Sequence, residues 1–196
     1  MRRSVPSPVA SAPMAPRIYT KTGDDGTTGL FYGGRVRKDS APIEINGVVD
    51  EAQAALGMAR AETEPGSEVN LRLTALARDL YVLMTEVATA PSNRHKLVPG
   101  STLVTEEMVL SLEEGIDDLL QRFDMPSDFI IPGENRVAAA LDLTRTIVRR
   151  AERLAVTDPV EGSLVLSYLN RLSDLLWAMA RWQEGPVHRL SRDGEA

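Results

Sequence analysis

The chain has 196 residues, of which 43% are apolar and 26% charged, with a formal net charge of −6; this is typical of one soluble globular domain and argues against nonspecific nucleic-acid binding, which needs a basic face. The absence of cysteine excludes disulfides, thiolate catalysis and Cys-based zinc, and two histidines are too few for a di-iron site made of two Glu-x-x-His pairs. The sequence contains no run of about 18 apolar residues, so no membrane span is predicted. We expect a cytoplasmic protein.

Residues 1–16 are rich in Ser, Pro and Ala. This composition predicts a disordered N-terminal tail. A transit or signal peptide is the alternative, although prolines interrupt any apolar segment there. Residues 17–185 are predicted to form a single domain, and residues 186–196 a C-terminal tail.

The segment 18–29 reads IYTKTGDDGTTG and has almost no apolar content. Its amides, hydroxyls and ammonium could wrap around an anion, which is typical of a polyphosphate site. Gly/Thr-rich loops also bind many anions and often none. Residues 30–42 follow, and we predict that they are irregular, with a basic cluster of Arg35, Arg37 and Lys38.

Helical periodicity begins after this loop and continues to the end of the predicted domain. We predict five helices, at about 44–63, 68–89, 105–123, 134–157 and 161–183, with a polar loop at 91–99 and an irregular segment at 125–133. Five helices of this length with short connections predict an all-α antiparallel bundle with almost no sheet.

The fourth predicted helix carries Arg145, Arg149 and Glu152 on one flank, next to its apolar stripe. One interpretation is a solvated charged face with Arg–Glu pairs. The other is a set of guanidinium groups that bind phosphates, because Arg holds such anions bidentately. The position beside the apolar stripe favours the second interpretation.

Three further features each have two interpretations. Asn170 stands in mid-helix, where Asn is unfavourable. One interpretation is a solvated polar face, and the other is contact with a ligand or a neighbouring subunit. Asp50 and Glu51 are a surface pair, or partners of a buried Arg. The segment FIIPG at 129–133 is a hydrophobic staple, or an apolar wall for a large flat ligand.

Six motifs together resemble the PduO-type ATP:cob(I)alamin adenosyltransferases. They are YTKTGDDGTTG at 19–29, Lys38, GVVDE at 47–51, FIIPG at 129–133, RTIVRRAERLAV at 145–156 and YLNRLSDLLWAMAR at 168–181. The resemblance covers nearly the whole chain except the first 16 residues and the C-terminal tail.

The resemblance implies a five-helix bundle that assembles as a homotrimer, with active sites between subunits. It implies that ATP is bound by Thr20, Lys21, Thr22, Gly23, Thr28, Gly29, Lys38, Arg149, Arg150, Glu152, Arg153 and Asn170. The expected catalytic residues are Arg149, Arg145 paired with Asp50 across the subunit interface, and Phe129 beneath the corrin ring. Mg²⁺ would be held mainly by the ATP phosphates.

The implied function is transfer of the 5′-deoxyadenosyl group of ATP to the Co(I) of a reduced corrinoid, which forms adenosylcobalamin and releases triphosphate. A reductase and an adenosylcobalamin-dependent enzyme would be partners. The alternative is a non-catalytic homologue that senses or delivers the cofactor. This chain departs from the family pattern at Pro42, Glu134 and Asp142, and we expect the two acidic residues to affect corrinoid binding more than ATP binding.

Overall fold

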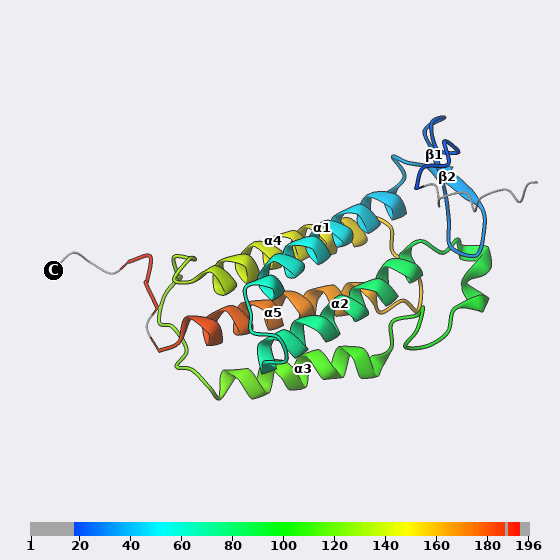
Figure 1. Ribbon diagram of the computed structural model, residues 1–196. Helices are drawn as coiled ribbons and strands as arrows, with labels where there is room; N and C mark the ends of the chain where they lie inside the picture. The colour runs from blue at the N-terminus through cyan, green and yellow to red at the C-terminus, as the bar shows by residue number, and fades with distance from the viewer. Residues whose placement is uncertain (1–17, 187, 193–196) are drawn as a thin grey trace, which may run out of the picture.

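A computed structural model describes residues 18–186 and 188–192, so the predicted tail at 1–16 lies outside the described residues. The prediction of a helical bundle is confirmed, and its five long helices lie lengthwise beside one another (Figure 1). They are α1 (Ala41–Ala61), α2 (Glu68–Val87), α3 (Glu106–Leu120), α4 (Arg136–Ala155) and α5 (Val165–Glu184). None of the described helices is long and apolar enough to cross a membrane.

Polar side chains fix where three of these helices begin. Ser67, Thr105 and Asn135 each accept a hydrogen bond from a backbone N–H in the first turn of α2, α3 and α4, respectively. These contacts satisfy N–H groups that have no partner within the helix. Helix α5 ends at Gly185, whose positive φ of 83° suits glycine.

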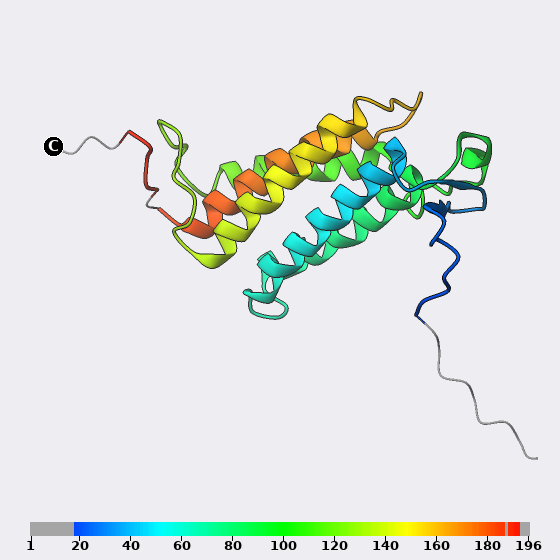
Figure 2. The same cartoon turned by 90° about the horizontal axis from the view of Figure 1, so that it is seen from above.

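Helix α4 packs against both α1 and α5, while α2 covers α1 and α3 covers α5 (Figure 2). The predicted apolar stripe of α4 is confirmed, because Leu141, Thr144, Val148 and Ala151 are all fully buried. Beside this stripe, Arg149 and Arg153 of α4 are exposed.

Two predicted irregular segments contain short regular elements. Strand β1 (Thr27–Gly29) pairs antiparallel with β2 (Arg35–Arg37), so residues 30–42 are not wholly irregular. The 3₁₀ helix η1 (Pro91–Lys96) lies within the predicted polar loop. Elements of three and six residues are too short to show a clear period in the sequence.

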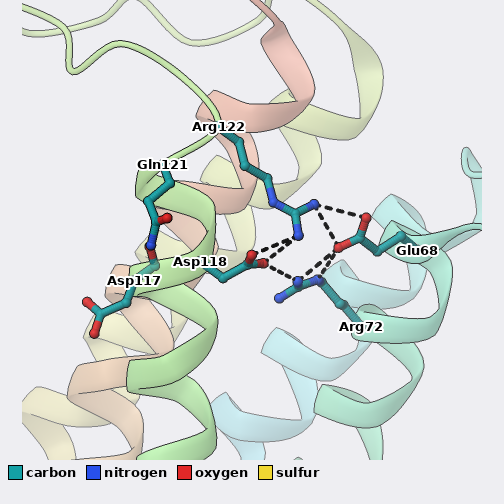
Figure 3. A network of polar contacts seen from close by, with 6 residues as sticks. All are labelled: Glu68, Arg72, Asp117, Asp118, Gln121 and Arg122. Atoms are coloured by element: carbon teal, nitrogen blue, oxygen red, sulfur yellow. Dashed lines mark hydrogen bonds and ion pairs between the residues drawn. The ribbon is translucent and has the colours of Figure 1, made fainter.

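An ion-pair network joins the start of α2 to the end of α3 (Figure 3). Glu68 accepts hydrogen bonds from Arg72 and Arg122, and Asp118 accepts hydrogen bonds from the same two arginines. The guanidinium of Arg122 also lies 5.5 Å from the ring centroid of Trp182 in α5. These contacts fix the end of α3, where the segment leading to α4 begins.

The two ends of the bundle carry different segments (Figures 1 and 2). One end holds β1, β2, the start of α1, the end of α4 and the start of α5, and we call it the loop end. The opposite end holds the α3–α4 connection and residues 188–192. The predicted ATP ligands therefore lie toward the loop end, whereas Phe129 lies at the opposite end.

Candidate functional site

The Gly/Thr-rich loop is folded onto itself by its own side chains. The guanidinium of Arg35 donates to the Thr22 carbonyl at 2.5 Å and to the Thr27 hydroxyl at 2.6 Å. Asp25 accepts hydrogen bonds from the Thr27 N–H and hydroxyl, and these bonds hold the pKa of Asp25 below its usual value. Sequence reasoning had placed Arg35 only in a basic cluster and missed this structural role.

Lys38 lies against this loop at Gly23. A Cβ atom on Gly23 would stand 3.2 Å from the Lys38 Nζ and 3.1 Å from the Thr27 carbonyl oxygen. Glycine therefore allows the ammonium group to approach the backbone closely. Of the predicted loop ligands, Gly23 and Thr28 are half-buried, and the others are exposed: Thr20, Lys21, Thr22, Gly29 and Lys38.

The helical ligands are only partly brought together within the chain. The side-chain amide of Asn170 donates to Glu152 at 2.8 Å, so these two predicted residues form one polar pair between α4 and α5. Arg153 donates to the Arg149 carbonyl, and Arg149 itself is exposed. Arg150 forms an ion pair with Glu51 of α1, which supports a partly structural role for it.

A cavity of about 510 Å³ opens at the loop end, a volume within the usual range of small-molecule sites. Leu30 and Val36 line it from the N-terminal segment, and Ala155 and Leu166 line it from α4 and α5. The lining residues adjoin the loop and the end of α4, and none of the predicted ATP ligands is among them.

Glu86, on the wall of this cavity, is 1% exposed and was missed by sequence reasoning. Its carboxylate accepts hydrogen bonds from Arg94 at 2.8 Å, from Ser163 at 2.6 Å and from the Val104 N–H at 2.8 Å. It therefore ties α2 to η1 and to the α4–α5 connection. The sequence feature that could have indicated Glu86 is a carboxylate within the apolar run of the helix that became α2.

Phe129 is 79% exposed. A hydrophobic staple would bury this ring, so Phe129 itself does not act as one, and an apolar wall for a flat ligand stays a prediction. The pairing of Asp50 with Arg145 does not occur within one chain, because Arg145 donates to Asp142 at 3.2 Å. Asp50 is exposed and forms no ion pair with the described residues, so a pair across an interface stays a prediction.

Asp142, one of the departures from the family pattern, is buried rather than free at the surface. It is 4% exposed, and its carboxylate accepts a hydrogen bond from Arg181 at 2.5 Å. Two arginines therefore compensate its charge, which removes the reason to expect that it repels a corrinoid. The side chain of Arg181 is itself only 2% exposed.

No cluster of three or more carboxylate or histidine side chains within residues 18–186 and 188–192 could hold a metal ion.

Comparison with known proteins decides the family. The sequence model of the family described as cobalamin adenosyltransferase matches residues 18–183. The chain belongs to the cobalamin adenosyltransferase family. Within this family, the chain is 39% identical over 173 residues to a corrinoid adenosyltransferase of Citrobacter freundii, covering 86% of this chain and 95% of that one.

Other members of the family are similar over comparable lengths. A corrinoid adenosyltransferase of Bacillus subtilis is 39% identical, covering 84% of this chain and 85% of that one. The corrinoid adenosyltransferase PduO of Salmonella typhimurium is 35% identical, and there the match covers 88% of this chain but only 51% of the relative.

The fold is also that of the family. A variant of the PduO-type ATP:corrinoid adenosyltransferase from Lactobacillus reuteri, solved with cobalamin and ATP, superposes with a TM-score of 0.78 at 30% identity. The match covers 90% of this chain and 97% of that one.

Proposed function

We propose that this member of the family transfers the 5′-deoxyadenosyl group of ATP to the Co(I) of a reduced corrinoid. The electron pair of Co(I) forms the Co–C bond at the 5′ carbon of the ribose. The C–O bond to the triphosphate breaks, and triphosphate leaves with that bond's electron pair. The products are adenosylcobalamin and triphosphate.

One observation carries the proposal. The loop with Lys38 and the α4 flank with Arg149 lie toward the same end of the bundle, and a cavity opens there that is lined by Leu30 and Val36, next to the loop, and by Ala155 at the end of α4. Separately, a Gly/Thr-rich loop or an arginine flank binds many anions. Together, they provide cationic groups for a polyphosphate beside an apolar cavity for a nucleoside.

The side chains have simple roles in this reaction. No general base is needed, because the nucleophile is the metal of the substrate. Lys38 and Arg149 would stabilise the charge that develops on the departing triphosphate, and MgATP would be the form that binds. Asn170 and Glu152 would position the nucleotide so that its 5′ carbon faces the cobalt.

Phe129 would lie beneath the corrin ring. An exposed aromatic side chain offers a flat apolar surface, and on such a surface the lower axial ligand of cobalt would be displaced. A four-coordinate cobalt is easier to reduce to Co(I). Phe129 precedes α4, and Arg149 lies about 20 Å along that helix from its first residue, so a corrin ring and an ATP molecule would together occupy the distance between them.

We further propose that the protein is a homotrimer and that each active site is shared by two subunits. Helices α1 and α4 lie side by side and expose Met58 and Leu143 at 61% and 49%, respectively. Asp50 is exposed on α1, and Arg145 is only half-buried on α4. A neighbouring copy would cover the apolar side chains and pair Asp50 with Arg145 in a heterologous interface.

The same proposal defines the cellular context. The enzyme would act in the cytoplasm, where ATP is available. A reductase would supply the Co(I) corrinoid, because Co(I) is oxidised readily. An adenosylcobalamin-dependent enzyme would take up the product.

An anaerobic turnover assay tests the reaction. The protein is mixed with reduced cobalamin, ATP and Mg²⁺, and the Co(I) absorbance and the phosphate products are followed. Loss of the Co(I) absorbance with release of intact triphosphate supports attack at the 5′ carbon. Binding of ATP and corrinoid without a Co–C bond would refute catalysis and support the sensor or delivery alternative.

A mixing experiment tests whether the site is shared. Lys38→Ala and Arg149→Ala chains are each inactive in our proposal, and the two are co-expressed and purified together. If the loop comes from one subunit and Arg149 from its neighbour, roughly a quarter of the sites in a random mixture are intact. A mixture as inactive as the two separate variants would show that one chain supplies both groups.

A further inference from the structure

Beyond α5, residues 188–192 lie alongside the segment that carries Phe129 (Figure 1). The N–H of Ser191 donates to the Phe129 carbonyl at 2.7 Å, and the N–H of Ile131 donates to the Arg189 carbonyl at 2.9 Å. Between them, Ile130 and Leu190 form an antiparallel bridge. Residues 188–192, which we call the C-terminal strand segment, therefore hold the backbone of residues 129–131 in one register.

A buried chain of polar contacts anchors the start of this segment. His188 Nδ1 lies 2.9 Å from Glu184 Oε2, and the other Glu184 oxygen accepts from Arg181 at 2.8 Å. The side chain of Glu184 is fully buried, and that of His188 is 8% exposed. The His188 ring also packs edge-on against Phe123, with the two ring centroids 6.2 Å apart.

The Phe129 segment is fixed to the same corner of the bundle at its other end. The side-chain amide of Asn135, the N-cap of α4, donates to the Gln183 carbonyl of α5 at 2.7 Å. Exposed ion pairs, Arg189–Glu134 and Arg192–Asp128, flank the two paired backbones at 3.6 Å. Such surface pairs contribute little energy, so the backbone bonds and the His188 anchor provide most of the restraint.

The side chain of Phe129 cannot position itself by burial, because it is 79% exposed. Its direction depends on the backbone that carries it. We propose that the C-terminal strand segment is a positioning element for Phe129, and that its loss weakens corrinoid binding and adenosylation but leaves the ATP end unchanged. This inference rests on the proposed function, which assigns the corrinoid-facing role to Phe129.

Ser191→Pro tests the inference, with Ser191→Ala as the matched control. Proline lacks the N–H that donates to Phe129, whereas alanine keeps it. We expect Ser191→Pro to raise the KM for reduced cobalamin about tenfold to a hundredfold, since small misplacements of a positioning group have such effects. The KM for ATP and the thermal midpoint should stay close to those of Ser191→Ala.

A second pair of variants tests the anchor. His188→Ala removes the contact with Glu184, and His188→Asn keeps an amide donor near the Nδ1 position. Binding of cob(II)alamin in the presence of ATP is followed by electron paramagnetic resonance, which measures the four-coordinate fraction. We expect this fraction to fall in His188→Ala and to recover in His188→Asn.

Amide hydrogen exchange of the ligand-free protein gives an independent readout. Exchange at Ile131 should become faster in Ser191→Pro than in Ser191→Ala, whatever the protein catalyses. A cobalamin KM and a four-coordinate fraction in Ser191→Pro equal to those of the control would overturn the inference. Failure of the wild-type protein to bind or adenosylate cobalamin would instead refute the proposed function.

Discussion

Asp142 and Arg181 form a buried ion pair between α4 and α5, with 2.5 Å between the carboxylate oxygen and the guanidinium nitrogen. Arg181 is 2% exposed, and among the described residues its one further ion-pair partner is Glu184. Replacing Asp142 by Ala leaves this guanidinium undercompensated in the core. We expect the Asp142→Ala variant to lose about 3 kcal/mol of unfolding free energy, measured by urea denaturation.

A double variant separates the charge effect from packing. In Asp142→Leu with Arg181→Met, the buried guanidinium is removed together with Asp142, and the buried Glu184 loses Arg181 but keeps its contact with His188, so the loss should be smaller than in Asp142→Ala. A double variant that is less stable than the single variant would contradict this explanation. It would show that the ion pair itself contributes most of the stability.

The network of Figure 3 predicts a pH dependence of stability. Arg122 and Arg72 hold the pKa of Glu68 below 4.5, and Arg122, followed by Arg72, holds the pKa of Asp118 below 3.8. A lowered pKa in the folded state means that the stabilisation is fully present above the unfolded-state values. It is lost as the pH falls through the lower folded-state values.

The test compares the wild-type protein with a Glu68→Gln, Asp118→Asn double variant. We expect the wild-type protein to be more stable at pH 6 to 7, and this advantage to disappear progressively below about pH 4. Asp117→Asn is the control, because Asp117 is a neighbouring exposed residue outside the ion pairs. An advantage that stays constant down to the acid transition would contradict the assignment.

Much of the fold could be predicted from the sequence, because long helices show their period over many turns. The apolar stripe at Leu141, Thr144 and Val148 predicted the bounds of α4 to within two residues at each end. The pairing of Thr27–Gly29 with Arg35–Arg37 could not be predicted in this way. Three residues per strand show no clear alternation, and the register depends on contacts such as the Arg35 hydrogen bonds.

The candidate site likewise contains features that the sequence could predict and contacts that it could not. The loop and the arginine flank are local patterns, so the sequence indicated both. The burial of Asp142 depends on its pairing with Arg181, which is 39 residues away. The contact of Ser191 with Phe129 joins segments that have no common motif. Such contacts depend on the assembled bundle, and a single sequence contains no direct signal for them.

Gly23 offers a test of the loop. In Gly23→Ala, the new Cβ would stand 3.1 Å from the Thr27 carbonyl oxygen and 3.2 Å from the Lys38 Nζ. We expect the side chain of Lys38 to be displaced, which raises the KM for ATP about tenfold, because charge-assisted contacts to phosphate depend on geometry. Gly57→Ala, in α1 with no atom within 4 Å of a new Cβ, is the control and should keep the wild-type KM.

The result for Gly23→Ala can be separated from unfolding. The loop is exposed and contributes no side chain to the core, so the thermal midpoint should change little. A variant with the wild-type KM for ATP would show that Lys38 either adjusts to the added methyl group or does not contact the nucleotide.

Arg149 provides the most direct test of the triphosphate site. Its guanidinium is exposed on the flank of α4 that faces away from the core, so Arg149→Ala should leave folding and the oligomeric state unchanged. Removing one group that stabilises developing charge typically lowers kcat about a hundredfold to a thousandfold. Anaerobic turnover and sedimentation together measure the two effects.

Arg136→Ala is the matched control, because Arg136 begins the same helix and its side chain is 85% exposed. It should keep wild-type kcat, since its ion pair is with Glu62 and it is not among the predicted ATP or corrinoid ligands. Arg149→Lys should recover only part of the activity, because an ammonium cannot bind phosphate oxygens in the bidentate manner of a guanidinium. Full activity in Arg149→Ala would show that the triphosphate is bound elsewhere.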